Sequence, residues 1–193
     1  SHKASADPSK LTSSPLKTTA TSGFSSEPDA KSLPFPLWAR CLAKAWRQPD
    51  QSLLHDSHPG GYQALRQTLS HYLYISRGVK CDAHQIVITA GQRDSLSLVS
   101  KALMSHGDSV FMENPGYPVQ REVIKSLGLK EVFLELDKQG AQLPTAYQQG
   151  TNLAIIVPSR QYPLGTAMSG PRKLAWLNYA QTHNCWLIED DYD

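Results

Sequence analysis

From residue 85 to its end, the chain alternates between short apolar runs and longer amphipathic stretches. The apolar runs have the length of strands and are apolar throughout, which is typical of strands buried on both faces. The strands that this pattern predicts cover residues 85–89, 109–113, 130–136, 152–157 and 185–189. The helices that it predicts between them cover residues 93–107, 117–128 and 170–184. Because strands that alternate with helices form parallel sheets, we expect an α/β fold: a mainly parallel sheet with helices on both faces.

The N-terminal part of the chain has a different composition. Residues 1–33 are rich in Ser, Thr, Ala, Pro and Lys and contain few large apolar side chains. Such a segment cannot bury enough surface to fold alone, so we interpret it as a linker or N-terminal arm. Residues 34–193 are expected to form one domain. Apolar residues at helical spacing predict a helix within residues 33–46, and a second within residues 60–78 that is buried on one face and ends at Gly78.

Composition narrows the possible classes of protein. The formal net charge of +2 neither favours nor excludes nucleic acid as a partner. The three cysteines are far apart and form no CxxC pair, which argues against a disulfide scaffold and favours a reduced, cytoplasmic compartment. No apolar run approaches the ~20 residues of a membrane span, so we expect no membrane partner. Scattered histidines without ligand spacing give no support to a metal site.

The loop after the first predicted strand could bind an anion. The strand of residues 86–89 leads through Gly91, which permits a tight turn, directly into a helix. The free N–H groups of Gln92, Arg93 and Asp94 would lie at the helix N-terminus, which attracts phosphate. The alternative is an ordinary strand-to-helix loop in which Asp94 helps to cap the helix.

Two further strand ends bring aromatic and polar side chains to the same edge. Glu113 ends one strand, and the Asn-Pro-Gly turn after it would present Tyr117, whose flat ring could stack on a ligand or pack the loop onto the sheet. The strand that ends at Val157 is followed by Gln161 and Tyr162. Because ligands of open α/β sheets bind at the carboxyl ends of the strands, we expect these groups to share one site.

The last predicted strand ends in a cluster of acids. Strand alternation places Asp190 and Tyr192 on one side and Glu189 and Asp191 on the other. These residues could also be helix-capping groups. Taken together, polar groups at four strand ends and one anion-binding helix end indicate a ligand that is phosphorylated, flat and aromatic.

The motifs ENPGYP, QYPLG and IEDDYD occur here in one order. In this respect the chain resembles, from about Phe24 to Asp193, the aminotransferase-like domain of MocR-type regulators of the GntR family. Those regulators join a winged helix-turn-helix, through a variable linker, to a domain of the fold-type I aminotransferase class. The resemblance therefore implies that residues 34–193 are an incomplete large domain of an aminotransferase of class I and II.

The resemblance also implies pyridoxal 5′-phosphate as the cofactor. The cofactor-binding residues that it implies are Gly91, Gln92, Arg93, Tyr117, Gln161, Asp190 and Tyr192. Residues 91–93 match the phosphate loop, and Tyr117 matches the aromatic residue that stacks on the pyridine ring. Asp190 matches the carboxylate that faces the pyridine nitrogen, and Tyr192 the phenol near O3′. Gln161 lies in the loop that passes the ring.

In this family the Schiff-base lysine lies beyond the IEDDYD segment. We therefore expect no catalytic residue within this chain and no transamination by it alone. The first interpretation is a part of a transcriptional regulator that binds pyridoxal phosphate and an amino-acid-like effector, forms a homodimer, and contacts DNA only through a winged helix-turn-helix outside this chain. The alternatives are a part of a free-standing class I or II aminotransferase, or a truncated product without activity.

Overall fold

The computed structural model describes residues 30–47, 59–145 and 150–191. The chain divides into two compact units, residues 1–41 and 42–193, and the sheet described below belongs to the second. The helices are η2 (Ala30–Ser32), α1 (Phe35–Arg47), α2 (Gln63–Arg77), η4 (Ala83–Gln85), α3 (Gln92–Leu103), α4 (Pro118–Ser126) and α5 (Gly170–His183). The strands are β1 (Ser109–Glu113), β2 (Lys130–Leu134), β3 (Leu136–Asp137), β4 (Gly140–Ala141), β5 (Thr151–Ile156) and β6 (Trp186–Glu189).

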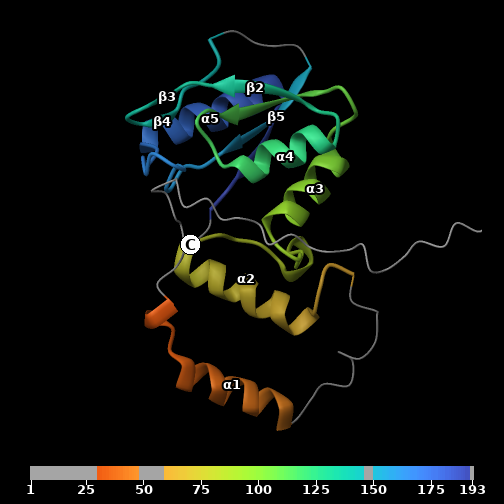
Figure 1. The fold of residues 1–193 in the computed structure, drawn as a ribbon, viewed down its shortest axis with the longest axis vertical. Helices are drawn as coiled ribbons and strands as arrows, with labels where there is room; N and C mark the ends of the chain where they lie inside the picture. Colours follow the sequence, from red (N-terminus) through yellow and green to blue (C-terminus); the bar gives the residue numbers. More distant parts are fainter. Residues whose placement is uncertain (1–29, 48–58, 146–149, 192–193) are drawn as a thin grey trace, which may run out of the picture. The chain divides into compact units, whose positions relative to one another are not determined.

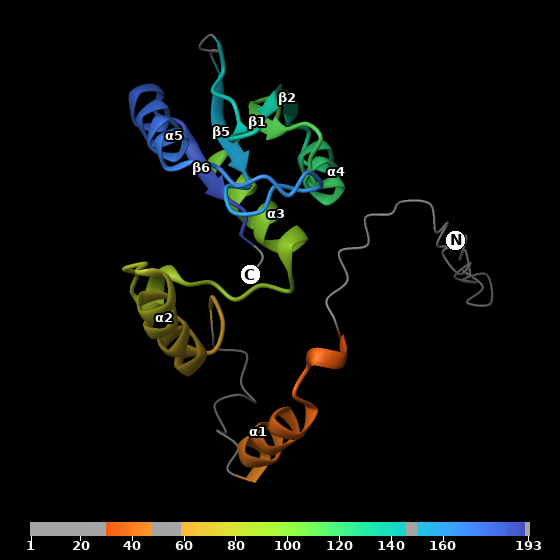
Figure 2. The same cartoon turned by 90° about the vertical axis from the view of Figure 1, so that its left-hand side faces the viewer.

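A parallel sheet of four strands organises the second unit (Figure 1), and its strands, labelled in Figure 2, follow the order β2-β1-β5-β6. Strands β1 and β5 lie in the middle, and their apolar runs are almost completely buried, as strands covered on both faces must be. Helices α3 and α4 pack on one face and α5 on the other, as Figure 2 shows. The predicted α/β fold with a covered parallel sheet is therefore confirmed.

Alternation along β1 divides the core into two layers. Val110 and Met112 pack with residues of α3 and α4, whereas Phe111 packs with Trp176 and Tyr179 of α5. The predicted strand over residues 130–136 is interrupted, because Gln142 N–H binds the carbonyl oxygen of Glu135 and a short antiparallel pair, β3 and β4, follows.

The β3–β4 pair is joined to α5 by polar contacts. Arg172 Nη1 and Trp176 Nε1 donate to the carbonyl oxygen of Ala141 at 2.9 and 3.1 Å. Arg172 Nη2 also binds Asp137 at 2.8 Å, and this hydrogen bond lowers the pKa of the Asp137 carboxyl. These contacts fix the small sheet on the α5 side of the core.

The strand predicted for residues 85–89 is wrong for this structure. Residues 86–89 pair with no strand in the described part of the chain, and Ile88 N–H instead donates to the carbonyl oxygen of Gly60 at 2.8 Å. An apolar run becomes a strand only where a neighbouring strand accepts its backbone hydrogen bonds, and periodicity alone does not show whether one is present.

The two N-terminal helices form where they are predicted, but one expectation about them is wrong. Helix α2 ends at Gly78 as expected, with a left-handed φ of 67° that suits glycine. However, none of the residues of α1 or α2, all of which the structure describes, is buried. Leu65 and Tyr72, predicted for the buried face of α2, are exposed. The prediction that residues 1–33 form a linker falls mostly on residues 1–29, which lie outside the described residues.

Candidate functional site

The candidate site lies where β1, β5 and β6 end and α3 begins. Asp190 follows β6 directly, and its backbone N–H donates to the carbonyl oxygen of Ile156 at 2.9 Å. Its carboxylate Oδ2 accepts hydrogen bonds from the side-chain amides of Gln92, on α3, and Gln120, on α4, the latter at 2.7 Å. The structure therefore brings the predicted residues Asp190 and Gln92 together from positions far apart in the sequence.

The neighbouring acids point elsewhere, as strand alternation predicts. The Asp191 carboxylate forms an ion pair with Arg77 at the end of α2, and Glu189 is exposed. Tyr192, predicted to share the side of Asp190, lies outside the described residues. Asp190 is thus the acid that the end of β6 delivers to the α3 and α4 side.

The N-terminus of α3 has the geometry of an open anion cradle. Gly91 precedes the helix with a φ of 140°, a conformation that L side chains rarely adopt, and apart from its two chain neighbours no described residue has an atom within 4 Å of a Cβ built on it. The first hydrogen bond of the helix runs from Ser95 N–H to Gly91 at 3.0 Å, so the preceding N–H groups have no carbonyl partner within the helix.

Side chains at the α3 N-terminus take separate roles. Asp94 Oδ2 accepts from Ala90 N–H at 3.1 Å, which ties the loop to the first turn of α3, but no side chain forms a capping hydrogen bond at the N-cap residue Gly91. The side chain of Arg93 pairs with exposed Glu122 on α4. Arg93 therefore offers its backbone N–H at the helix end, while its guanidinium is engaged at the surface.

Tyr117 immediately precedes α4, and its ring meets the ring of Tyr162. The ring centroids are 5.4 Å apart and the planes are inclined by 83°, an edge-to-face contact. The packing role considered for Tyr117 is therefore present, and its predicted stacking on a ligand stays a prediction. Gly116 allows this turn, because a Cβ there would lie 2.4 Å from the carbonyl oxygen of Glu113.

Gln161 is buried inside the loops rather than directed into open space. Its side chain is 1% exposed, and Nε2 lies within hydrogen-bond distance of Glu113 Oε2, at 3.0 Å, and of the carbonyl oxygens of Pro115 and Tyr162. Its Oε1 accepts from Leu164 N–H at 3.3 Å. These contacts tie the loop after β1 to the loop after β5, and a direct contact of Gln161 with a cofactor stays a prediction.

Sequence reasoning missed two buried residues of the site, Glu113 and Gln120. Glu113 is 3% exposed and accepts from Val157 N–H at 2.9 Å and from Gln161. Burial raises the pKa of the Glu113 carboxyl, its two hydrogen bonds act in the opposite direction, and the charge of Asp190 raises the pKa further. In the sequence, Glu113 resembled the ordinary end of a strand. However, an acid that terminates a fully apolar run is itself a signal of a candidate site residue.

The signal for Gln120 is its position on α4. It lies three residues after Tyr117, and such residues lie on one face of a helix. A polar residue three positions after the residue that precedes the helix therefore lies toward the same edge of the sheet. Its burial, with a side-chain amide aimed at Asp190, is what the structure adds.

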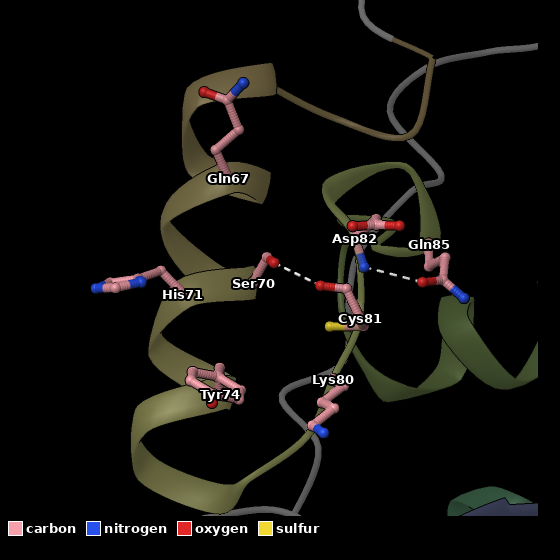
Figure 3. Close-up of a pocket in the computed structure, with 8 residues that line it drawn as sticks. All are labelled: Gln67, Ser70, His71, Tyr74, Lys80, Cys81, Asp82 and Gln85. Carbon is pink, nitrogen blue, oxygen red and sulfur yellow. Dashed lines mark hydrogen bonds between the residues drawn. The ribbon is translucent and has the colours of Figure 1, made fainter.

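A separate hollow lies between α2 and residues 80–85 (Figure 3). It has a volume of about 430 Å³, and Ser70 Oγ bridges it by donating to the carbonyl oxygen of Cys81 at 2.5 Å. Its lining residues are Gln67, Ser70, His71, Tyr74, Lys80, Cys81, Asp82 and Gln85. It shares no residue with the site around Asp190.

Within residues 30–47, 59–145 and 150–191, His, Cys, Asp and Glu side chains form no group of three or more that could hold a metal ion. None of the helices in those same ranges has the length and apolar character needed to cross a membrane.

The sequence matches the family model for aminotransferases of class I and II over residues 26–192. The chain belongs to this family. Members of the aminotransferase class I and II family depend on pyridoxal phosphate. The matched range contains all the strands of the parallel sheet and all the predicted cofactor-binding residues.

Curated relatives of the chain are transcriptional regulators. It is 32% identical over 166 residues to the probable rhizopine catabolism regulatory protein MocR of Rhizobium meliloti, covering 86% of this chain and 34% of the relative. It is 31% identical over 166 residues to the pyridoxine biosynthesis transcriptional regulator PdxR of Corynebacterium glutamicum, covering 86% of this chain and 35% of the relative. The chain spans about a third of the length of these relatives.

Solved aminotransferases share the fold. An archaeal alanine:glyoxylate aminotransferase superposes with a TM-score of 0.78 at 26% identity, covering 86% of this chain and 43% of that one. A kynurenine aminotransferase of Pyrococcus horikoshii superposes with a TM-score of 0.76 at 24% identity, covering 85% of this chain and 43% of that one. The predicted fold, part of a fold-type I aminotransferase large domain, is thereby confirmed.

Proposed function

We propose that this chain is part of the pyridoxal-phosphate-binding effector and oligomerisation domain of a MocR-type transcriptional regulator. The observation that carries the proposal is the position of Asp190. Its carboxylate is held by two neutral amides at the carboxyl edge of the sheet, and one of those amides belongs to the first residue of α3. A fixed carboxylate beside an anion-binding helix end suits a cationic ring that carries a phosphate.

The residues of the site fit this cofactor. The N–H groups of residues 91–93 are suited to the phosphate, because the space in front of Gly91 is open. Asp190 is suited to the protonated pyridine nitrogen, since its side-chain donors in the described structure are uncharged and leave its negative charge uncompensated. When bound, the cofactor supplies a protonated pyridine ring that withdraws electrons. Tyr117 would then lie against the ring and Tyr192 near O3′.

The wider assembly is part of the same proposal. We infer that the full-length protein forms a homodimer in the cytoplasm and contacts DNA through a winged helix-turn-helix. We also infer that an amino-acid-like effector binds at the cofactor. Support comes from the regulators to which the chain is similar, which include MocR and PdxR.

A free-standing aminotransferase is the second candidate function. The solved structures that share the fold include an alanine:glyoxylate aminotransferase that is 26% identical. The reading frame upstream of residue 1 separates the two candidates. A winged helix-turn-helix there supports the regulator, whereas a start close to the first helix supports the enzyme.

A titration tests cofactor binding directly. Pyridoxal 5′-phosphate is added to the full-length protein and binding is followed by absorbance, with pyridoxal, which lacks the phosphate, as the matched ligand. We expect saturable binding of the phosphorylated compound and much weaker binding of pyridoxal, because the α3 N-terminus would lose its anion. Equal affinity for both compounds, or no saturation with either, would contradict the proposal.

A further inference from the structure

We propose that Gln120 is a positioning residue that holds the Asp190 carboxylate in the orientation in which it meets the ring nitrogen of the cofactor. This inference rests on the proposed function. Its basis is the hydrogen bond of 2.7 Å from Gln120 Nε2 to Asp190 Oδ2, made by a side chain that is 3% exposed. A buried donor is held by its surroundings, so it can fix the group that it binds.

Contacts on both sides of Gln120 hold the first turns of α4 in place. Its N–H donates to the carbonyl oxygen of Tyr117 at 3.1 Å, and Val123 and Ile124 in the next turn of α4 are buried in the core below the sheet. Gln120 therefore connects the residue predicted to stack on the ring with the carboxylate predicted to face its nitrogen. A shift of α4 would move both groups together.

The chemistry of an amide suits this role. A glutamine donates a hydrogen bond without bringing a charge, so Asp190 keeps its negative charge for a cationic partner. Glu113 lies close enough for the charge of Asp190 to affect it, so the site already holds two acids. A third acid in place of Gln120 would force carboxylates to share a proton.

The second donor, Gln92, provides an internal comparison. It binds the same Asp190 oxygen, but it is exposed at the start of α3. Water can replace an exposed amide donor at little cost, whereas a buried donor that is removed leaves its acceptor without a partner. The two glutamines should therefore contribute unequally.

The test uses Gln120→Met, which keeps the volume of the side chain and removes the donor, with Gln181→Met, the same change at an exposed position of α5, as its matched control. Affinity for pyridoxal 5′-phosphate is measured in the full-length protein, together with the pH profile of the absorbance of the bound cofactor. We expect Gln120→Met to weaken binding about tenfold. It should also lower the pH at which the ring nitrogen loses its proton, because Asp190 would no longer be held in place. Gln181→Met should leave the affinity unchanged, and Gln92→Met should weaken binding less than Gln120→Met does.

Gln120→Glu provides a second variant that preserves polarity and size. We expect it to bind the cofactor more weakly than Gln120→Met above neutral pH and to recover on acidification, as one carboxylate gains a proton. A loss of folding alone would lower thermal stability without moving the pH profile. If the unaltered protein binds the cofactor and Gln120→Met has the same affinity and pH profile, the inference is overturned while the proposed function stands. If the unaltered protein does not bind it, both are overturned.

Discussion

Two tryptophans on helices show how differently the two ends of the chain are built. Trp176 of α5 is 0% exposed, packs against the sheet, and donates to the carbonyl oxygen of Ala141. Trp46 of α1 is 78% exposed. Both belong to helices that are predicted from the sequence. The comparison teaches that periodicity determines where a helix forms, whereas burial depends on a second surface that the helix pattern does not encode.

The same contrast separates α4 from α2. Helix α4 buries Gln120, Val123 and Ile124, and these residues connect the core to the candidate site. Helix α2 is longer but buries none of its residues, and it contributes Arg77 to an exposed ion pair. A functional site can be assembled precisely only on the elements whose positions the core fixes.

The largest expected effect tests the comparison of the tryptophans. Trp176→Ala should lower the free energy of unfolding by about 3–5 kcal/mol, because it leaves a cavity and removes a hydrogen bond. Trp46→Ala should change it by less than about 0.5 kcal/mol, since the side chain is already exposed. Urea denaturation of both variants measures the difference. Equal losses of unfolding free energy in the two variants would mean that Trp46 is buried in solution. The contrast between the two tryptophans would then be wrong.

The next prediction compares two adjacent acids. Asp190 contacts α3 and α4, whereas Asp191 contacts α2. Asp190→Asn should weaken pyridoxal phosphate binding about ten- to a hundredfold, because it removes a charge-assisted hydrogen bond worth roughly 1.5–3 kcal/mol. Asp191→Asn should cost much less, since Asp191 is engaged with Arg77 of α2. Absorbance titrations of both variants decide the matter. A larger loss at Asp191 would show that the acid facing the cofactor has been assigned wrongly.

The third prediction concerns Glu113 in the core beneath the site. Burial raises its pKa above the ordinary value of 4.5, so the folded protein holds this proton more tightly than the unfolded chain. The contribution of Glu113 to the free energy of unfolding is therefore fully present below pH 4.5 and is lost as pH rises through the folded pKa. Glu113→Gln should remove this decrease in the free energy of unfolding with rising pH. The measurement is urea denaturation of both proteins at a series of pH values, and parallel profiles would contradict the prediction.

Much of the fold and part of the site could be predicted from the sequence. The continuous apolar runs of β1 and β5 predict central strands, and Gly78 predicts the end of α2, because these signals are local. Asp190 was singled out among the acids at the end of a strand by the resemblance to MocR-type regulators, and its role at a cofactor stays a prediction. Gln120 and Glu113 were missed, since their roles arise from contacts with residues distant in the chain. Residues 86–89 were predicted as a strand because periodicity does not reveal whether a neighbouring strand exists.

The smallest expected effect concerns the contact between α2 and the end of β6. The Arg77–Asp191 ion pair is partly exposed, with side chains 34% and 23% accessible, so water and salt screen its attraction. Arg77→Gln should lower the free energy of unfolding by no more than about 1 kcal/mol, and the loss should shrink as salt is raised. Denaturation at low and high salt measures this, with Asp191→Asn as the matched partner variant. A loss of several kcal/mol that does not respond to salt would show that Arg77 does more for α2 than form a surface ion pair. The contrast between the buried sheet and the exposed helix α2 would then be wrong.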